Sequence, residues 1–96
     1  MFDLFDQFIG STKPVITPDG SQLAVQLYGQ FVLRCHGEAP VRWLREDRPT
    51  RIIKEEKRDH HLSTINVTKV TSLYRGNYIC LEESTGQSNS IYVYVT

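Results

Sequence analysis

The 96-residue chain has little of several features that mark large classes of protein. It contains only two cysteines, Cys35 and Cys80, which are too few for a multi-bridge scaffold or a four-thiolate zinc site but enough for one disulfide. Its eleven basic and eleven acidic residues cancel, so the total charge gives no reason to expect a nucleic-acid or polyanion binder. No apolar run reaches the length of about 18 residues that a spanning helix needs, so we expect no membrane insertion by this chain. The length allows one domain, which disfavours a multi-domain enzyme.

The N-terminal residues differ in character from the rest. Met1 to Ile9 places apolar residues at helical spacing, with acidic residues opposite them. This stretch is short and acidic, whereas a secretory signal has a basic start and a longer apolar stretch. Gly10 and Ser11 then resemble a flexible joint, which suits an engineered leader as well as native sequence. We therefore divide the chain into a leader, residues 1–11, and a domain, residues 12–96.

From Pro14 onward, short apolar and polar alternations predict strands, and no helical period appears. Turn-forming residues such as those from Gly37 to Pro40 separate the alternations. The alternating sets are Leu23, Val25 and Leu27; Phe31, Leu33 and Cys35; Val41 and Trp43; Ile65 and Val67; Tyr78 and Cys80; and Ile91, Val93 and Val95. About seven short strands in a domain of this length predict an all-β sandwich.

Four residues make the sandwich more specific. Cys35 lies on one predicted strand, Trp43 on the next and Cys80 on the penultimate one, the order expected when a single disulfide joins two sheets against a buried indole. Tyr78, two residues before Cys80, has the position of a tyrosine corner. A disulfide implies an oxidising compartment, and hence secretion or an ectodomain. The expected core residues are Cys35, Cys80, Trp43, Tyr78, Leu33 and Val67.

The run from Ile65 to Cys80 resembles the segment of immunoglobulin domains that leads into strand F, in its apolar, glycine, tyrosine and cysteine positions. One position departs from that pattern. Most members have an aspartate two residues before the glycine, whereas this chain has Tyr74 before Gly76. The usual Asp–Arg bridge beneath the sandwich is therefore in doubt. The spacing between the cysteines leaves little room for an extra strand pair, which favours an I-set or C2-like topology.

Asn66, Val67 and Thr68 form an N-glycosylation sequon without proline in the middle. If Ile65 and Val67 face the core, Asn66 faces solvent, because side chains alternate along a strand. We therefore predict that Asn66 is a glycosylation site and that its face of the sheet is not a tight interface.

No set of residues predicts catalysis or metal binding. His60 and His61 could join His36 in a metal site, but an exposed loop pair has no fixed geometry for a closed coordination shell. Ser63 and Thr64 lack the nucleophile elbow and the glycine run of a hydrolase. We expect neither a catalytic residue, a metal nor a cofactor.

Charge is unevenly distributed. Residues 42–58 contain seven basic and four acidic residues, and the remainder has the opposite imbalance. A basic segment on the strands lettered C and C′ and on their loops could attract an acidic partner. The alternative is a solvated sheet edge whose basic residues block edge pairing. Residues 44–62 contain no Phe, Tyr or Trp, so a stacking platform for nucleic acid is not supported. The candidate ligand-binding residues are Arg42, Arg45, Arg48, Arg51 and Lys54.

Three segments resemble the first ectodomain module of class III receptor tyrosine kinases, the group of receptors for macrophage colony-stimulating factor, stem cell factor and platelet-derived growth factor. They are Pro14 to Val25, Phe31 to Trp43 and Ser88 to Val95. The resemblance implies an extracellular module of a single-pass membrane receptor that binds a dimeric growth factor or a helical cytokine. In that family the first module either contacts the ligand or positions the modules that do.

Two other classes remain open. A cell-adhesion or structural module, or a soluble decoy receptor, would bind another immunoglobulin domain or a protein ligand through a sheet face and would share these sequence features. A cytosolic muscle-type module would share the fold but keep Cys35 and Cys80 as free thiols.

Overall fold

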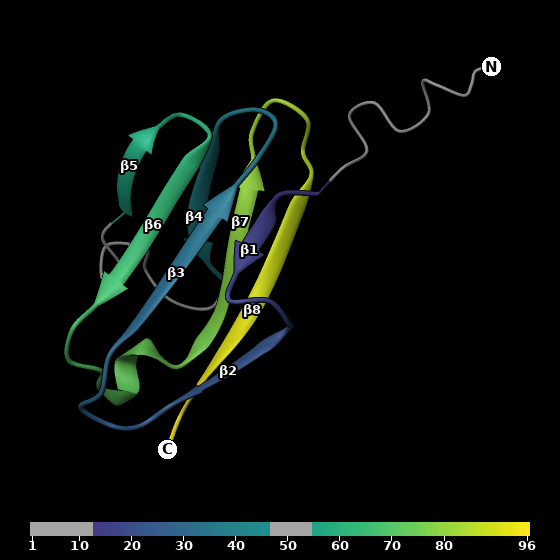
Figure 1. Ribbon diagram of the computed structural model, residues 1–96. Coiled ribbons are helices and arrows are strands. Elements are labelled where there is room, and N and C mark those ends of the chain that lie inside the picture. The colour runs from purple at the N-terminus through teal and green to yellow at the C-terminus, as the bar shows by residue number, and fades with distance from the viewer. Residues whose placement is uncertain (1–12, 47–54) are drawn as a thin grey trace.

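The structure is a computed structural model that describes residues 13–46 and 55–96. In these ranges the chain forms two four-stranded sheets that face each other (Figure 1). The expected leader, residues 1–11, lies outside the described residues. The elements are β1 (Val15–Thr17), β2 (Gln22–Val25), β3 (Phe31–His36), β4 (Val41–Arg45), β5 (Glu55–Asp59), β6 (Leu62–Val67), the 3₁₀ helix η2 (Ser72–Tyr74), β7 (Gly76–Glu82) and β8 (Ser88–Val95).

One sheet has the strand order β1-β3-β6-β5 and the other β2-β8-β7-β4. All neighbouring strands are antiparallel except β2 and β8, which are parallel. The chain crosses from the first sheet to the second between β1 and β2, where the peptide bond from Thr17 to Pro18 is cis. The predicted all-β sandwich is confirmed.

The core lies between the sheets because alternate side chains of every long strand point inward. Cys35 on β3 and Cys80 on β7 form a disulfide with an S–S distance of 2.04 Å, so the predicted bridge between the sheets is confirmed. Trp43 is opposite Cys80 in the sheet register, and its Nε1 donates to the Ser63 carbonyl of the facing sheet at 3.1 Å. The buried apolar residues are Ile16, Val25, Phe31, Leu33, Cys35, Val41, Trp43, Ile65, Val67, Val70, Tyr78, Cys80, Ile91 and Val93.

The structure differs from the strand prediction at Leu27. The alternation placed Leu27 on a strand with Val25, but β2 ends at Val25 and Leu27 is exposed. The chain turns there because Tyr28 adopts a positive φ of 67° and its N–H donates to the Val70 carbonyl. Two strands were also missed: β1 is only three residues long, and β5 is too charged to show an apolar alternation.

The expected placement of the basic segment on adjacent C and C′ strands is wrong for its described part. β4 belongs to one sheet, whereas β5 pairs with β6 in the other. The outer edge of β4 is bonded by groups of that second sheet, since the Trp43 N–H donates to the Glu55 carboxylate and the Val41 N–H to the His60 carbonyl. The segment therefore runs from one sheet to the other.

Candidate functional site

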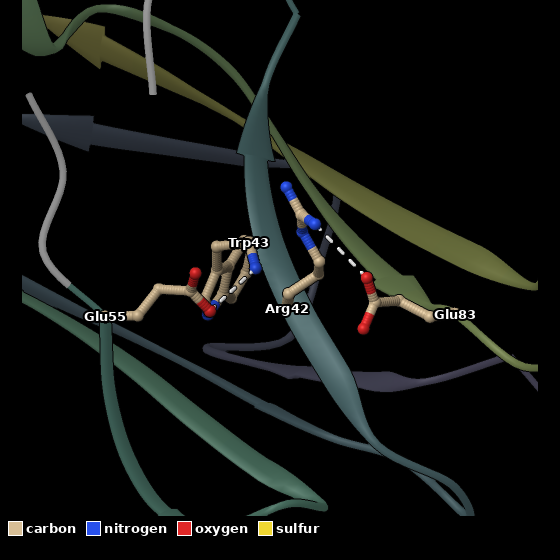
Figure 2. Close-up of polar contacts among 4 residues, drawn as sticks. All are labelled: Arg42, Trp43, Glu55 and Glu83. Atoms are coloured by element: carbon tan, nitrogen blue, oxygen red, sulfur yellow. Dashed lines mark hydrogen bonds and ion pairs between the residues drawn. The ribbon is translucent and has the colours of Figure 1, made fainter. Parts of the chain in front are cut away.

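Arg42 is the one candidate ligand-binding residue that the structure describes on the surface. Its guanidinium forms an ion pair with Glu83 at 3.1 Å, on the side of β4 that faces away from Trp43 and Glu55 (Figure 2). The two side chains are 44% and 51% exposed, so this pair contributes at most about 1 kcal/mol to stability. Glu83 also offsets the charge that Arg42 would present to an acidic partner.

Arg45 is buried, with 5% of its surface exposed, and does not belong to a basic surface. Its guanidinium donates to the Leu73 carbonyl at 2.8 Å and to the Arg75 carbonyl at 2.6 Å. It also lies 4.7 Å from the centre of the Tyr78 ring, a cation–π contact. The ligand-binding expectation fails for Arg45 because side chains alternate along β4, and Arg45 shares the inward face of Trp43.

Arg48, Arg51 and Lys54 lie outside the described residues. The structure therefore separates the two candidates that it does describe, placing Arg42 on the outer face of β4 and Arg45 under the sandwich.

The chain around Tyr74 binds the guanidinium of the buried arginine without the usual aspartate, although Arg45 Nε has no partner among the described residues. Backbone carbonyls on either side of Tyr74 accept the Arg45 hydrogen bonds. The Tyr74 ring packs edge-on against Phe31, with 6.4 Å between ring centres. The Tyr78 hydroxyl donates to the Tyr74 carbonyl at 2.6 Å, which is the bond expected of a tyrosine corner. Carbonyl dipoles thus replace a carboxylate.

Glu55 ties the two sheets together, a role that the sequence did not reveal. Its Oε1 accepts a hydrogen bond from the Trp43 N–H at 2.9 Å (Figure 2). The same oxygen accepts a second hydrogen bond from the Ser63 hydroxyl at 2.7 Å. An inward-pointing carboxylate on an edge strand also discourages edge-to-edge pairing with another chain. Contacts between Glu55 and residues 8 and 12 positions away leave no local sequence signal.

Glu82 is a buried acid, with 2% of its surface exposed. Its carboxylate accepts hydrogen bonds from the Thr85 hydroxyl at 2.6 Å and the Ala39 N–H at 3.0 Å. The Thr85 hydroxyl is the main reason that the pKa of Glu82 is lowered, although burial acts in the opposite direction. Glu82 thereby joins the β7–β8 turn to the loop between β3 and β4.

The outer face of the β2-β8-β7-β4 sheet has an aliphatic group on β4 and β7 and two tyrosines on β8, with Asn77 and Ser90 between them. Leu44 on β4 is opposite Ile79 on β7 in the sheet register, and both are half-buried. On β8, the rings of Tyr92 and Tyr94 lie 4.7 Å apart. We call this surface the apolar face, and it consists of Leu44, Ile79, Leu81, Tyr92 and Tyr94. Because these side chains point away from the core, the fold itself gives no reason for them to be apolar.

The histidines do not form a metal site. His36, His60 and His61 are exposed, and residues 13–46 and 55–96 contain no group of three or more histidine, cysteine, aspartate or glutamate residues that could hold a metal ion. In the same ranges no helix has the length and apolar character to span a membrane. Asn66, the sequon residue, is exposed on β6 as predicted.

Solved structures with similar folds are immunoglobulin domains. The ZIG-8 IG1 homodimer structure superposes with a TM-score of 0.63 at 15% identity, covering 82% of this chain and 81% of that one. A chimeric titin Z1Z2 structure superposes with a TM-score of 0.65 at 16% identity, covering 88% of this chain and 95% of that one. The Dscam1 Ig7 domain superposes with a TM-score of 0.59 at 22% identity, covering 86% of this chain and 96% of that one. The protein is thus an immunoglobulin-like β-sandwich with one disulfide between its sheets, as predicted.

Its relatives in sequence are receptors. The mast/stem cell growth factor receptor kita of Danio rerio is 44% identical over 86 residues, and the Kit receptor of Takifugu rubripes is 41% identical over 86 residues; each match covers 90% of this chain. Platelet-derived growth factor receptor alpha of Takifugu rubripes is 31% identical over 97 residues, covering 92% of this chain. No protein-family model matches the chain.

The chain belongs to the class III receptor tyrosine kinase family, as an extracellular immunoglobulin-like module. It spans 8% to 9% of the length of these three receptors. The matched part has an immunoglobulin fold, so the module itself is non-catalytic, as predicted.

Proposed function

We propose that this module contributes to the binding of a protein growth factor by a receptor of this family, through the apolar face. The observation that carries the proposal is the 44% identity to a receptor named for mast/stem cell growth factor. The Kit and platelet-derived growth factor receptors are named for growth factors. A module of such a receptor either touches the ligand or positions its neighbours, and the apolar face supports the first role.

The apolar face is suited to a protein partner because of how its side chains are arranged. In the sheet register Leu81 is opposite Arg42, and Ile79 is opposite Leu44. The half-buried aliphatic residues therefore form a continuous centre, and the ion pair of Arg42 and Glu83 lies beside it. An apolar centre with aromatic residues and a charged rim is typical of protein interfaces.

Docking through the face is also favoured over docking at the β4 edge of the sheet. On β4 the outward Trp43 N–H donates a hydrogen bond to the Glu55 carboxylate. The outward Val41 N–H donates one to the His60 carbonyl. These donors are therefore not available to a strand from another chain. Strand addition at the β4 edge is therefore disfavoured, and we assign the partner to the outer face.

The electrostatic component of the proposal rests on Arg42, with Arg48, Arg51 and Lys54 as further candidates. Arg45 is not among these candidates, because its guanidinium is buried beneath the sandwich and donates to backbone carbonyls there. Charge at the rim of an interface mainly raises the association rate and makes it depend on salt. We therefore expect Arg48→Glu to slow association at low salt more than at high salt, whereas salt-independent rates would contradict this component.

The decisive test is substitution at the centre of the apolar face. We expect Ile79→Arg to weaken binding of mast/stem cell growth factor or platelet-derived growth factor by roughly tenfold or more, since one buried apolar contact in an interface centre is worth at least about 1.4 kcal/mol. Val15→Arg is the matched control, because Val15 is 59% exposed on the outer face of the other sheet. Surface plasmon resonance measures affinity, and circular dichroism checks folding. A folded Ile79→Arg variant with unchanged affinity for both factors would exclude the apolar face.

A second candidate is binding of another immunoglobulin module through the same face. Proteins of the same fold form such pairs, as in the ZIG-8 IG1 homodimer and the ZIG-8–RIG-5 IG1–IG1 heterodimer. Sedimentation equilibrium of the 96-residue chain separates this candidate from growth-factor binding. Self-association that Ile79→Arg abolishes, together with no affinity for either growth factor, would favour the adhesion role.

A further inference from the structure

The outer face of the β1-β3-β6-β5 sheet differs from the apolar face in its chemistry. Thr64 on β6 is flanked in the sheet register by Arg34 on β3 and by Glu56 on β5. Asn66 lies two residues further along β6 and is exposed. This row therefore offers a basic group, a hydroxyl and an acidic group side by side, next to the asparagine of a sequon.

A hollow of about 370 Å³ lies at this place, lined by Arg34, Glu56, Leu62, Thr64 and Asn66. Thr64 is half-buried, and its register partners Arg34 and Glu56 lie on either side of it. Asn66 and Leu62 mark the two ends, about 13 Å apart at the usual rise of a strand. The hollow is therefore elongated along β6 and begins at the sequon asparagine.

Leu62 is the apolar residue among those that line the hollow. It points outward because Ser63 and Ile65, its neighbours in the alternation, are buried. A sugar ring presents hydroxyl groups at its rim and C–H groups on its face, and an N-acetyl group adds a methyl. Such a group can use both the polar sides of the hollow and its apolar end.

We propose that Asn66 carries an N-linked glycan whose first N-acetylglucosamine residues lie in this hollow, over Thr64, between Arg34 and Glu56, and toward Leu62. In the attachment step Asn66 Nδ2 forms a bond to C1 of the first sugar of a lipid-linked oligosaccharide pyrophosphate. The bond from C1 to the pyrophosphate oxygen breaks, the lipid pyrophosphate leaves with the electron pair, and Nδ2 releases one proton. Thr68, the third sequon residue, is exposed and accessible to the transferase.

A glycan in the hollow would cover the β6 region of this face. Protein partners would then be directed to the apolar face on the opposite side of the sandwich. The inference stands apart from growth-factor binding, because it concerns different residues on a different sheet.

The first experiment tests attachment. The 96-residue chain is secreted from mammalian cells behind a cleavable signal peptide, and intact mass is measured before and after peptide-N-glycosidase F. We expect a mass increment that the enzyme removes, with conversion of Asn66 to aspartate in the peptide. Thr68→Ala destroys the sequon and should lose the mass increment. The matched Thr68→Ser variant retains a sequon and should retain the mass increment. Secreted wild-type protein with an unmodified Asn66 would overturn the proposal.

The second experiment tests the position of the sugar. The glycan is trimmed to one N-acetylglucosamine, and nuclear Overhauser effects are measured from its protons to the methyl groups of Thr64 and Leu62. We expect contacts to Thr64, and contacts to Leu62 once the second sugar is retained. Leu62→Ser removes the Leu62 methyl groups and so loses the contacts to this residue. Val15→Ser, on β1, keeps the contacts to both Thr64 and Leu62. A glycan that is attached but shows no such contacts would overturn its placement in the hollow.

A third measurement separates the glycan from a protein partner on this face. Removing the glycan with Thr68→Ala leaves growth-factor affinity unchanged if the face does not dock protein. A tighter complex after removal would show that this face contacts the partner, and would overturn the statement that the glycan directs partners to the apolar face. Failure of the Ile79→Arg test would leave the mass and nuclear Overhauser readouts unaffected.

Discussion

The two ends of the sandwich each contain one buried charge, but they stabilise it differently. The upper end in Figure 1 consists of residues 37–40, 60–61 and 83–87, and the lower end of residues 26–30 and 71–75. At the upper end the Glu82 carboxylate accepts bonds from a hydroxyl and a backbone N–H. At the lower end Arg45 donates to two backbone carbonyls and contacts an aromatic ring, while its Nε has no partner among the described residues.

The comparison shows that neutral groups supply the hydrogen bonds described for both charges, and the charge of His61 also lowers the pKa of Glu82. Burial of an ion is costly unless such groups replace its hydration. A carboxylate needs a few donors, which a turn and a loop provide. A guanidinium has five N–H groups that are hard to satisfy together, and in Arg45 the Nε–H is one that has no partner among the described residues. The lower end therefore depends more strongly on its arginine and tolerates less change.

The largest effect is expected at the lower end. Arg45→Leu keeps the apolar stem but leaves the Leu73 and Arg75 carbonyls without their donor and removes the contact with the Tyr78 ring. We expect the free energy of unfolding to fall by about 3 kcal/mol. Urea denaturation measures this. Arg42→Leu, which removes an exposed ion pair, is the control and should cost less than about 1 kcal/mol. Equal losses in the two variants would contradict the importance of the buried arginine.

The next effect tests how closely the upper end is packed. A Cβ at Gly37 would lie 2.6 Å from Val41 Cγ1 and 2.8 Å from Glu82 Oε2. Because Val41 is fixed in the core, we expect Gly37→Ala to lower the free energy of unfolding by about 2 kcal/mol. Gly86→Ala serves as a comparison, since its Cβ meets no atom within 4 Å and only the positive φ of 77° is unfavourable. That variant should lose about 1 kcal/mol. A larger loss at Gly86 would indicate that backbone conformation, and not packing, limits this end.

The buried carboxylate makes the upper end sensitive to acid. The pKa of Glu82 is lowered in the folded protein, chiefly by the Thr85 hydroxyl. A group with a depressed pKa stabilises the fold above its unfolded pKa, and this contribution is lost as the pH falls through the folded pKa. We expect Glu82→Gln to cost about 1 kcal/mol at neutral pH and progressively less in acid. Urea midpoints measured from pH 7 to about pH 3 test this. Thr85→Val removes the main cause of the lowered pKa of Glu82. Like Glu82→Gln, it should therefore make the stability of the protein less dependent on pH.

The alternation in the sequence predicted the fold for a physical reason that extends to both buried charges. Val41 and Trp43 point inward, and the same period continues to Arg45. Tyr78 and Cys80 point inward, and the period continues to Glu82. The prediction of a basic segment counted charges along the chain without assigning them to a face. It therefore treated Arg45 as a surface residue, although the pattern already placed it inside.

Other contacts could not be predicted from the sequence. The bond from Trp43 to Glu55 depends on β5 joining the opposite sheet, and nothing in the charged β5 sequence indicates its partner strand. The apolar face was not recognised either, because the half-buried Ile79 lies between residues of the predicted core. By contrast, Asn66 was placed correctly on an exposed position, since its neighbours Ile65 and Val67 are clearly apolar.

The smallest effect concerns strain at the lower end. Tyr28 has a positive φ of 67°, which is unfavourable for a side chain with a Cβ, and its ring is exposed beneath a Lys69 Nζ that lies 5.6 Å from the ring centre. Asparagine tolerates this conformation better, so Tyr28→Asn should gain about 0.5 kcal/mol after loss of the cation–π contact. Tyr28→Val has the same exposure but a β-branched side chain that disfavours positive φ, so it should lose stability in the same urea assay. If valine and asparagine gave equal stability, backbone conformation at this turn would not be a source of strain, and the lower end would owe its sensitivity to Arg45 alone.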